Sequence, residues 1–215
     1  MVNRRRPRVL IADDHRLVAE ACVSLLEPEF EVVGTVSDGR ALLDAAATLR
    51  PDVVILDISM PQLNGLDAGE QVKQKIRTTK IIYLTMLQEP DVAAEAFRRG
   101  ASGYVLKHCN AEELVAAVRR VLRGESYLSA NITKDTVEFL LRSGAVYQEE
   151  KRITSRQGEV LQLIAEGKSM KEIAWILKLK PGTVAFHKYK MMDVLGIKTS
   201  AGLVEYAIKR HMIPH

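Results

Sequence analysis

The sequence lacks the features of a disulfide-bonded or membrane-spanning protein. It holds two cysteines, Cys22 and Cys109, without paired-cysteine spacing, which argues against a disulfide framework or a zinc site. No apolar run approaches the length that crosses a bilayer. The basic start has only a short apolar segment before Asp13-Asp14, which is unlike a signal peptide. We therefore expect a cytoplasmic protein with no membrane partner.

Aromatic residues are also scarce, at 5%, but the rest of the composition is ordinary for a globular protein, with 47% hydrophobic and 27% charged residues. The charge is divided unevenly along the 215 residues. Residues 151–215 carry 12 Lys/Arg and 5 Asp/Glu, a net of +7, whereas residues 1–150 carry 19 and 22, a net of −3. A basic C-terminal unit favours a polyanionic partner, although a solvated lysine-rich surface would look the same.

The first 125 residues alternate between short apolar runs and amphipathic segments. The runs predict strands at Arg8–Ala12, Glu31–Val36, Val53–Asp57, Lys80–Thr85 and Tyr104–Lys107. The segments predict helices at His15–Leu26, Arg40–Leu49, Leu66–Ile76, Val92–Arg99 and Ala111–Arg123, the last with Asn110 as N-cap. Five βα units with near-continuous apolar strands predict a parallel five-stranded sheet covered by helices on both faces.

The pattern changes after Gly124. One short helix is expected at 130–142, followed by a polar linker, and then by helices alone. These helices are predicted at Ser155–Glu166, Ser169–Leu177, Thr183–Leu195 and Ser200–His211, which is enough for a small four-helix bundle. We therefore predict a first domain over 1–126, a linker with a short helix over 127–149 and an all-α domain over 150–215.

Charged or hydroxyl-bearing side chains stand at the ends of four strands of the first domain. Asp13-Asp14 ends the first strand, Asp57 the third in "VVILDISMP", Thr85 the fourth and Lys107 the fifth. Because the carboxyl ends of parallel strands meet at one edge of a sheet, we expect these residues to converge. Each taken alone is more simply a polar residue capping a loop, and the interpretation depends on the whole set.

Three neighbouring carboxylates repel one another, and a bound divalent cation relieves that repulsion. Mg²⁺ is commonly held by one or two carboxylates together with phosphate oxygens. A lysine and a hydroxyl complete a site shaped for a phosphoryl group. Asp57 is then a nucleophile that forms an aspartyl phosphate, and Lys107 offsets the charge on the phosphoryl oxygens.

The motifs "IADDH", "LDISMP…NG", "YLT" and "GYVLK" resemble the receiver domain of two-component response regulators, over roughly residues 7–124. The resemblance implies a flavodoxin-like fold and a sensor histidine kinase as phosphoryl donor. It assigns the residues as follows: Asp57 as phosphoacceptor, Asp13, Asp14, Asp57 and the Ser59 carbonyl as the Mg²⁺ site, Thr85 and Lys107 as phosphoryl ligands, and Thr85 and Tyr104 as the switch pair. His108 stands where many receivers have a cis-proline, and this leaves the Lys107–His108 peptide open.

The segment "SMKEIAWILKLKPGTVAFHKYKMMDVLG" has the form of two helices joined by a turn at Pro181-Gly182. This is the plan of a helix-turn-helix, whose second helix enters the DNA major groove. The second helix carries Lys188 and Lys190 beside Tyr189, which suits contact with phosphates. The alternative is a helical bundle that binds protein.

The wider stretch from "ITSRQGEVLQLIAEG" to "LVEYA" is similar to the LuxR-type helix-turn-helix, which with a receiver gives a NarL/FixJ-type response regulator. Gln157, Ala185 and Lys188 depart from the usual pattern, so the family's contacts do not all carry over. The expected DNA-contacting residues are Thr183, Ala185, Phe186, His187, Lys188, Tyr189 and Lys190. Phe186 is suited to a thymine methyl, and Tyr189 to a base edge or a phosphate.

Together these features predict a phosphorylation-activated transcription regulator that is not a turnover enzyme. Phosphorylation would alter the surface around the fourth helix and fifth strand, favour a homodimer and promote binding to double-stranded promoter DNA, with Ser200–His211 as a dimer contact by resemblance. The alternatives are an output through protein contacts, DNA binding that ignores phosphorylation, and an aspartyl-phosphate phosphatase. The last is disfavoured because Ser59 stands where such enzymes have a second acid.

Overall fold

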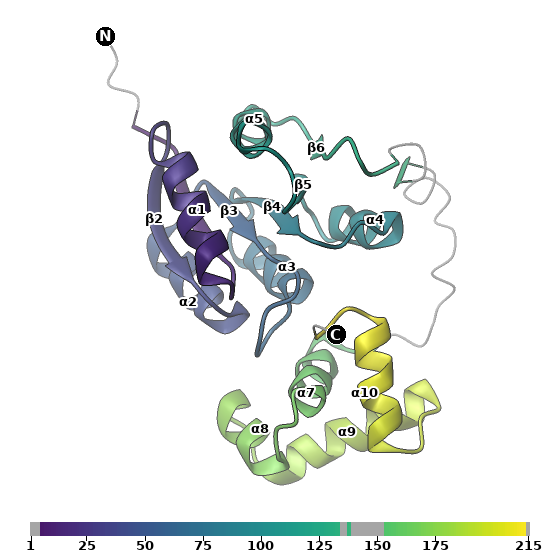
Figure 1. The fold of residues 1–215 in the computed structure, drawn as a ribbon. Coiled ribbons are helices and arrows are strands. Elements are labelled where there is room, and N and C mark those ends of the chain that lie inside the picture. Colours follow the sequence, from purple (N-terminus) through teal and green to yellow (C-terminus); the bar gives the residue numbers. More distant parts are fainter. Residues whose placement is uncertain (1–4, 134–136, 139–152, 214–215) are drawn as a thin grey trace.

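A parallel sheet with helices on both faces forms the N-terminal part of the chain in the computed structural model (Figure 1). The structure describes residues 5–133, 137–138 and 153–213. The strand order is β2-β1-β3-β4-β5-β6, and every neighbouring pair is parallel. The strands are β1 (Arg8–Ala12), β2 (Glu31–Val36), β3 (Val53–Leu56), β4 (Lys80–Thr85), β5 (Gly103–Leu106) and β6 (Tyr127–Leu128).

Five helices cover this sheet: α1 (Arg16–Leu26), α2 (Gly39–Leu49), α3 (Gly65–Lys75), α4 (Pro90–Arg98) and α5 (Ala111–Leu122). Side chains of β3 alternate between two apolar layers. Val53 and Ile55 pack in the layer that holds α1 and α5, whereas Val54 and Leu56 pack with α2, α3 and α4. All four are buried because both faces are covered, and this explains the unbroken apolar run in the sequence.

Asparagine and aspartate side chains fix where several of these helices begin. Asn64 accepts a hydrogen bond from Asp67 N and caps α3, and Asp38 accepts from Arg40 N and Ala41 N to cap α2. Asn110 accepts from Glu113 N, which confirms its predicted role as the cap of α5. Each cap satisfies backbone N–H groups that a helix leaves without internal partners.

The sheet has six strands where five were expected. The additional strand, β6, has only two residues and pairs with β5, so it leaves no apolar run that a sequence pattern could reveal. Beyond it, Ile132 and Val137 are buried in the same apolar cluster as Tyr104. Val137 and Glu138 are helical, and most of the helix predicted at 130–142 lies outside the described residues.

A bundle of four helices forms the C-terminal part: α7 (Ser155–Ala165), α8 (Met170–Leu177), α9 (Pro181–Leu195) and α10 (Ser200–Lys209). Its core includes Leu161, Ile173, Val184 and Leu203. Thr154 and Ser169 form capping boxes at the starts of α7 and α8, and Gly196 ends α9 at φ +72°, a backbone angle that favours glycine. Within the described residues, no helix is long and apolar enough to cross a membrane.

Leu56→Ala should lower the free energy of unfolding of the N-terminal domain by about 2–5 kcal/mol, because it leaves a cavity between β3 and the helices that cover it. Leu17→Ala is the matched control, since Leu17 on α1 is 82% exposed, and its effect should stay within about 0.5 kcal/mol. Urea denaturation of both variants measures the difference. Equal losses would contradict the layered core described above.

Candidate functional site

Asp57 sits directly after β3 at the carboxyl edge of the sheet. Its backbone N–H donates to the Ala12 carbonyl at 2.9 Å, and its Oδ1 accepts from Ile58 N at 2.7 Å. The following loop packs tightly behind it, since a Cβ on Gly65 would lie only 2.0 Å from the Asp57 carbonyl oxygen. The Asp57 backbone is therefore closely packed, and its side chain is buried, with Asp57 at 4% exposure.

Three carboxylates and one imidazole gather at this edge. Ligand atoms of Asp13, Asp14, His15 and Asp57 all lie within 4.8 Å of one another. Asp13 is buried and accepts from His15 N at 2.8 Å, and His15 Nδ1 lies 2.9 Å from an Asp14 oxygen. Such a set of oxygen donors can hold a divalent cation. The sequence pattern predicted that the three aspartates lie here, but it gave no signal for His15. Ser59, the other predicted metal ligand, lies two residues beyond Asp57 and is half-buried.

Lys107 joins the two buried carboxylates. Its Nζ lies 2.8 Å from Asp57 Oδ2 and 2.9 Å from Asp13 Oδ2. Burial lowers the pKa of Lys107, but the adjacent Asp57 and Asp13 carboxylates outweigh burial and raise that pKa above its usual value. The raised pKa of Lys107 stabilises the folded state. This stabilisation is fully present at a pH below the pKa that Lys107 has in the unfolded chain, and it is lost as the pH rises through the pKa that Lys107 has in the folded state.

The predicted switch pair meets at the start of the β4–α4 loop. Thr85 is buried, and its Oγ1 accepts from Leu87 N at 3.3 Å. The Tyr104 hydroxyl donates to the Leu87 carbonyl at 3.0 Å, and burial raises the pKa of Tyr104. Both side chains therefore bind the same loop residue. The Lys107–His108 peptide is trans, as are the other peptide bonds of the described residues.

Helix α9 presents two exposed aromatic side chains, Phe186 at 59% and Tyr189 at 65% exposure. Lys190 Nζ lies 5.6 Å from the Phe186 ring centroid, a cation–π distance. Lys188 Nζ donates to Ser200 Oγ on α10 at 2.7 Å, a contact at the surface between α9 and α10. Of the other expected DNA-contacting residues, Thr183, Ala185 and His187 are partly exposed along α9.

Comparison with known families now assigns both halves of the chain. Residues 9–119 match the family described as "Response regulator receiver domain", and residues 151–207 match "Bacterial regulatory proteins, luxR family". The chain is a response regulator. Its DNA-binding domain is of the LuxR type, and a receiver joined to such a domain is the organisation of a phosphorylation-dependent transcription regulator.

Relatives of the same length support this assignment. The response regulator is 36% identical to the oxygen regulatory protein NreC of Staphylococcus aureus over 214 residues, covering 96% of this chain and 99% of NreC. It is similar to solved RcsB of Salmonella typhimurium, with a TM-score of 0.63, 28% identity and coverage of 95% and 98% of the two chains. RcsB of Salmonella enterica serovar Typhimurium bound to the promoter P1flhDC with BeF3⁻ gives a TM-score of 0.59, 28% identity and coverage of 97% and 98%.

Lys107→Met should destabilise the response regulator by about 3–5 kcal/mol in the absence of divalent cations, because Asp13 and Asp57 then remain buried without their counter-charge. Added Mg²⁺ should restore more stability to the variant than to the wild type, since the cation supplies the missing positive charge. Urea denaturation with and without Mg²⁺ measures both effects. An equal Mg²⁺ effect on the two proteins would count against a cation at this cluster.

Proposed function

We propose that Asp57 accepts a phosphoryl group from a sensor histidine kinase. The observation that carries this proposal is the Lys107 ammonium, which lies 2.8 Å from Asp57 Oδ2 and is thereby close enough to offset the charge on phosphoryl oxygens bound at Asp57. An Asp57 carboxylate oxygen attacks the phosphorus of a phosphohistidine, the P–N bond breaks, and the imidazole leaves with that electron pair. The Thr85 hydroxyl would donate to a phosphoryl oxygen.

The acidic cluster would hold Mg²⁺ through Asp13, Asp14 and Asp57, with the Ser59 carbonyl as a further ligand by family resemblance. When bound, the cation offsets negative charge on the phosphoryl oxygens. His15 lies within the same cluster. Its imidazole would favour binding of a transition metal at this site over Mg²⁺. Ser59, half-buried beside Asp57, offers no carboxylate to activate water, which supports a signal over a turnover enzyme.

Asp57→Asn should abolish covalent phosphorylation by acetyl phosphate, because the amide is not a nucleophile. The variant should also lose the increase in dimerisation and in promoter affinity that phosphorylation gives to the wild type. Phosphate-affinity gel electrophoresis and sedimentation velocity measure the two effects. A variant that dimerises and binds DNA as well as phosphorylated wild type would refute the switch.

We further propose that α9 enters the DNA major groove with Phe186 and Tyr189 against base edges and Lys190 against phosphate. The exposed ring of Phe186 suits a thymine methyl, and the Lys190 ammonium over that ring limits its rotation. Lys188 is held by Ser200, so we assign it a lesser part than its charge suggests. Such contacts combine sequence reading with salt-dependent affinity for the backbone.

Tyr189→Ala should weaken binding to a cognate operator more than binding to random DNA, because a lost base contact reduces discrimination by about 1–3 kcal/mol. Lys190→Ala is the matched control, for which both affinities should fall together as a phosphate contact predicts. Fluorescence anisotropy at several salt concentrations measures all four affinities. Equal losses on both DNAs for Tyr189→Ala would remove its role in reading bases.

We also propose that activation produces a homodimer in the cytoplasm, which would place two α9 helices one DNA turn apart or a multiple of it. RcsB is recorded as dimers on DNA, which supports this arrangement. In the response regulator, the surface around α4 and β5 is partly occupied by its own chain, because β6 pairs with β5 and Ile132 and Val137 join the same apolar cluster as Val92. Dimerisation through that surface would therefore require β6 and the following residues to move.

A further inference from the structure

Trp175 is the single tryptophan of the chain, and it lies on the surface of helix α8. It is 83% exposed, the highest exposure of any large hydrophobic side chain among the described residues. Burial of an indole removes about 150–250 Å² of largely apolar surface from water, so a ring left in solvent forgoes a large favourable contribution to folding. Its position suits a contact outside the bundle.

Helix α8 has a buried side and an exposed side. Three of its residues pack into the core of the bundle, namely Ile173, Ala174 and Leu177. Trp175 shares the exposed side with Lys171, four residues earlier, and with Lys178, three residues later and just past the end of the helix, which is the spacing of neighbours on one helix face. These three exposed residues are here called the α8 stripe. The stripe is not part of the core that holds the bundle together.

The two lysines of the α8 stripe have no partner of opposite charge. Both are exposed, and no carboxylate of the described residues pairs with either ammonium. Glu172, the acidic residue nearest in sequence, is engaged in the capping box with Ser169. By contrast, the exposed Lys209 of α10 pairs with Glu205 at 2.8 Å. The stripe therefore presents uncompensated positive charge on either side of a large apolar ring.

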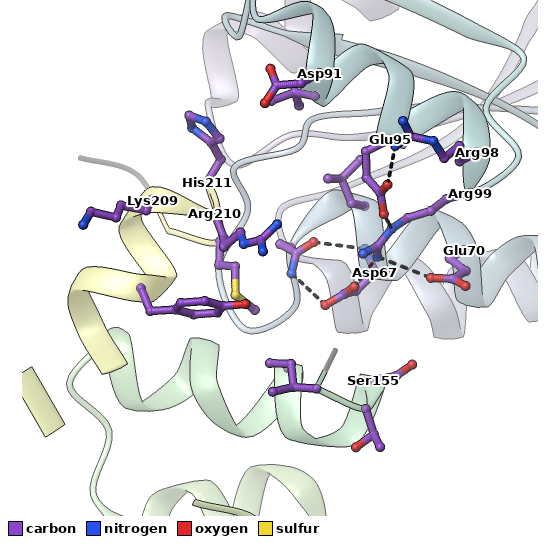
Figure 2. Close-up of a pocket in the computed structure, with 18 residues that line it drawn as sticks. Asp67, Glu70, Asp91, Glu95, Arg98, Arg99, Ser155, Lys209, Arg210 and His211 are labelled. Atoms are coloured by element: carbon purple, nitrogen blue, oxygen red, sulfur yellow. Dashed lines mark hydrogen bonds and ion pairs between the residues drawn. The ribbon is translucent and has the colours of Figure 1, made fainter. Parts of the chain in front are cut away.

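The rest of the molecule leaves the α8 stripe uncovered. Helix α7 faces the receiver, where Gln162 accepts a hydrogen bond from Asn64 N at 2.6 Å. A cleft of about 420 Å³ between the domains is lined on the bundle side by the start of α7 and the end of α10 (Figure 2), and none of the described residues of α8 lines it. The exposure of Trp175 is that of the chain with both domains in place. The stripe is therefore accessible to a partner in this arrangement.

An acidic protein surface suits the α8 stripe better than DNA does. The backbone of a duplex attracts lysines, but its bases are stacked on one another and leave no apolar pocket for an indole, since stacking of bases on aromatic side chains is characteristic of single strands. Protein interfaces bury tryptophan in central pockets, where it carries much of the binding energy, and surround it with a polar rim. The complementary surface is therefore an apolar pocket with carboxylates around it.

We propose that the α8 stripe binds RNA polymerase, at an acidic surface with an apolar pocket for the Trp175 ring. A transcription regulator on promoter DNA acts beside this enzyme. The rings proposed to read DNA, Phe186 and Tyr189, lie on α9 and not on α8, so one domain holds DNA and the enzyme through different helices. The inference adds a protein contact to the DNA binding proposed above, and it does not depend on phosphorylation of Asp57.

The test measures binding of purified bacterial RNA polymerase holoenzyme to the full chain by biolayer interferometry. Trp175→Ala should raise the Kd at least about thirtyfold, the loss expected for a tryptophan at the centre of an interface. Trp175→Phe should retain part of the affinity, because a smaller ring still enters the pocket. Leu17→Ala is the matched control, since Leu17 is 82% exposed but lies on α1, and it should leave the Kd unchanged.

The lysines and DNA provide the second set of measurements. Lys171→Gln and Lys178→Gln together should slow association with the polymerase and reduce its dependence on salt, because charges at the rim steer the encounter. Wild type and Trp175→Ala should unfold at the same temperature and bind random duplex DNA with equal affinity in fluorescence anisotropy.

An unchanged Kd for the polymerase in Trp175→Ala, or no binding of the polymerase to wild type, would overturn the proposal. A loss of DNA affinity without a loss of polymerase affinity would also overturn it and would assign the α8 stripe to nucleic acid. These outcomes are separate from a failure of the proposed operator contacts, which is measured with Tyr189→Ala.

Discussion

The Lys107 ammonium is the interaction on which the rest of the structure depends. Two carboxylates, Asp13 and Asp57, are brought to nearly full burial by the ends of neighbouring strands, and this would be prohibitive without a counter-charge between them. Lys107 follows β5, which β4 separates from β3, and its ammonium contacts both carboxylates. The balance is incomplete, because one ammonium faces two buried carboxylates and the partly exposed Asp14. That residual negative charge makes the site receptive to a cation.

The strands that form this charge cluster also contact other parts of the molecule. β3 supplies Asp57, and the same backbone continues without a break into the loop under α7. β4 and β5 supply Thr85 and Tyr104, which both bind Leu87 in the loop before α4. Thr85 and Tyr104 are themselves buried, and the loop after Asp57 contacts Gln162 of α7.

Much of this was accessible from sequence because the strands are bounded sharply. The bounds of β1, β2 and β4 were predicted to the residue. Charged or turn-forming residues follow β1 and β2, whereas β4 is a run of β-branched and aromatic residues, "KIIYLT". The meeting of Asp13, Asp57 and Lys107 followed from the rule that parallel strands end at one edge. β6 was not predicted because two residues are too few to show a periodic pattern. The contact of Gln162 with Asn64, 98 residues apart, depends on how two domains dock, and no local pattern encodes that. His15 looked like the start of a helix, and only the fold showed its ring beside Asp14.

The short strand β6 has a bearing on how copies of this protein can meet. Sheets with a free edge can recruit a further strand from another molecule, but here the β5 edge is already taken by the protein's own Tyr127–Leu128, and the new edge offers only two residues. Continuous strand pairing between receivers is thereby discouraged on that side. Self-association is left to helical surfaces, whose packing is set by side-chain shape and charge and is readily reversed. For a protein that we propose assembles and separates with each signal, a closed sheet edge disfavours a strand-paired dimer that would be too stable to dissociate.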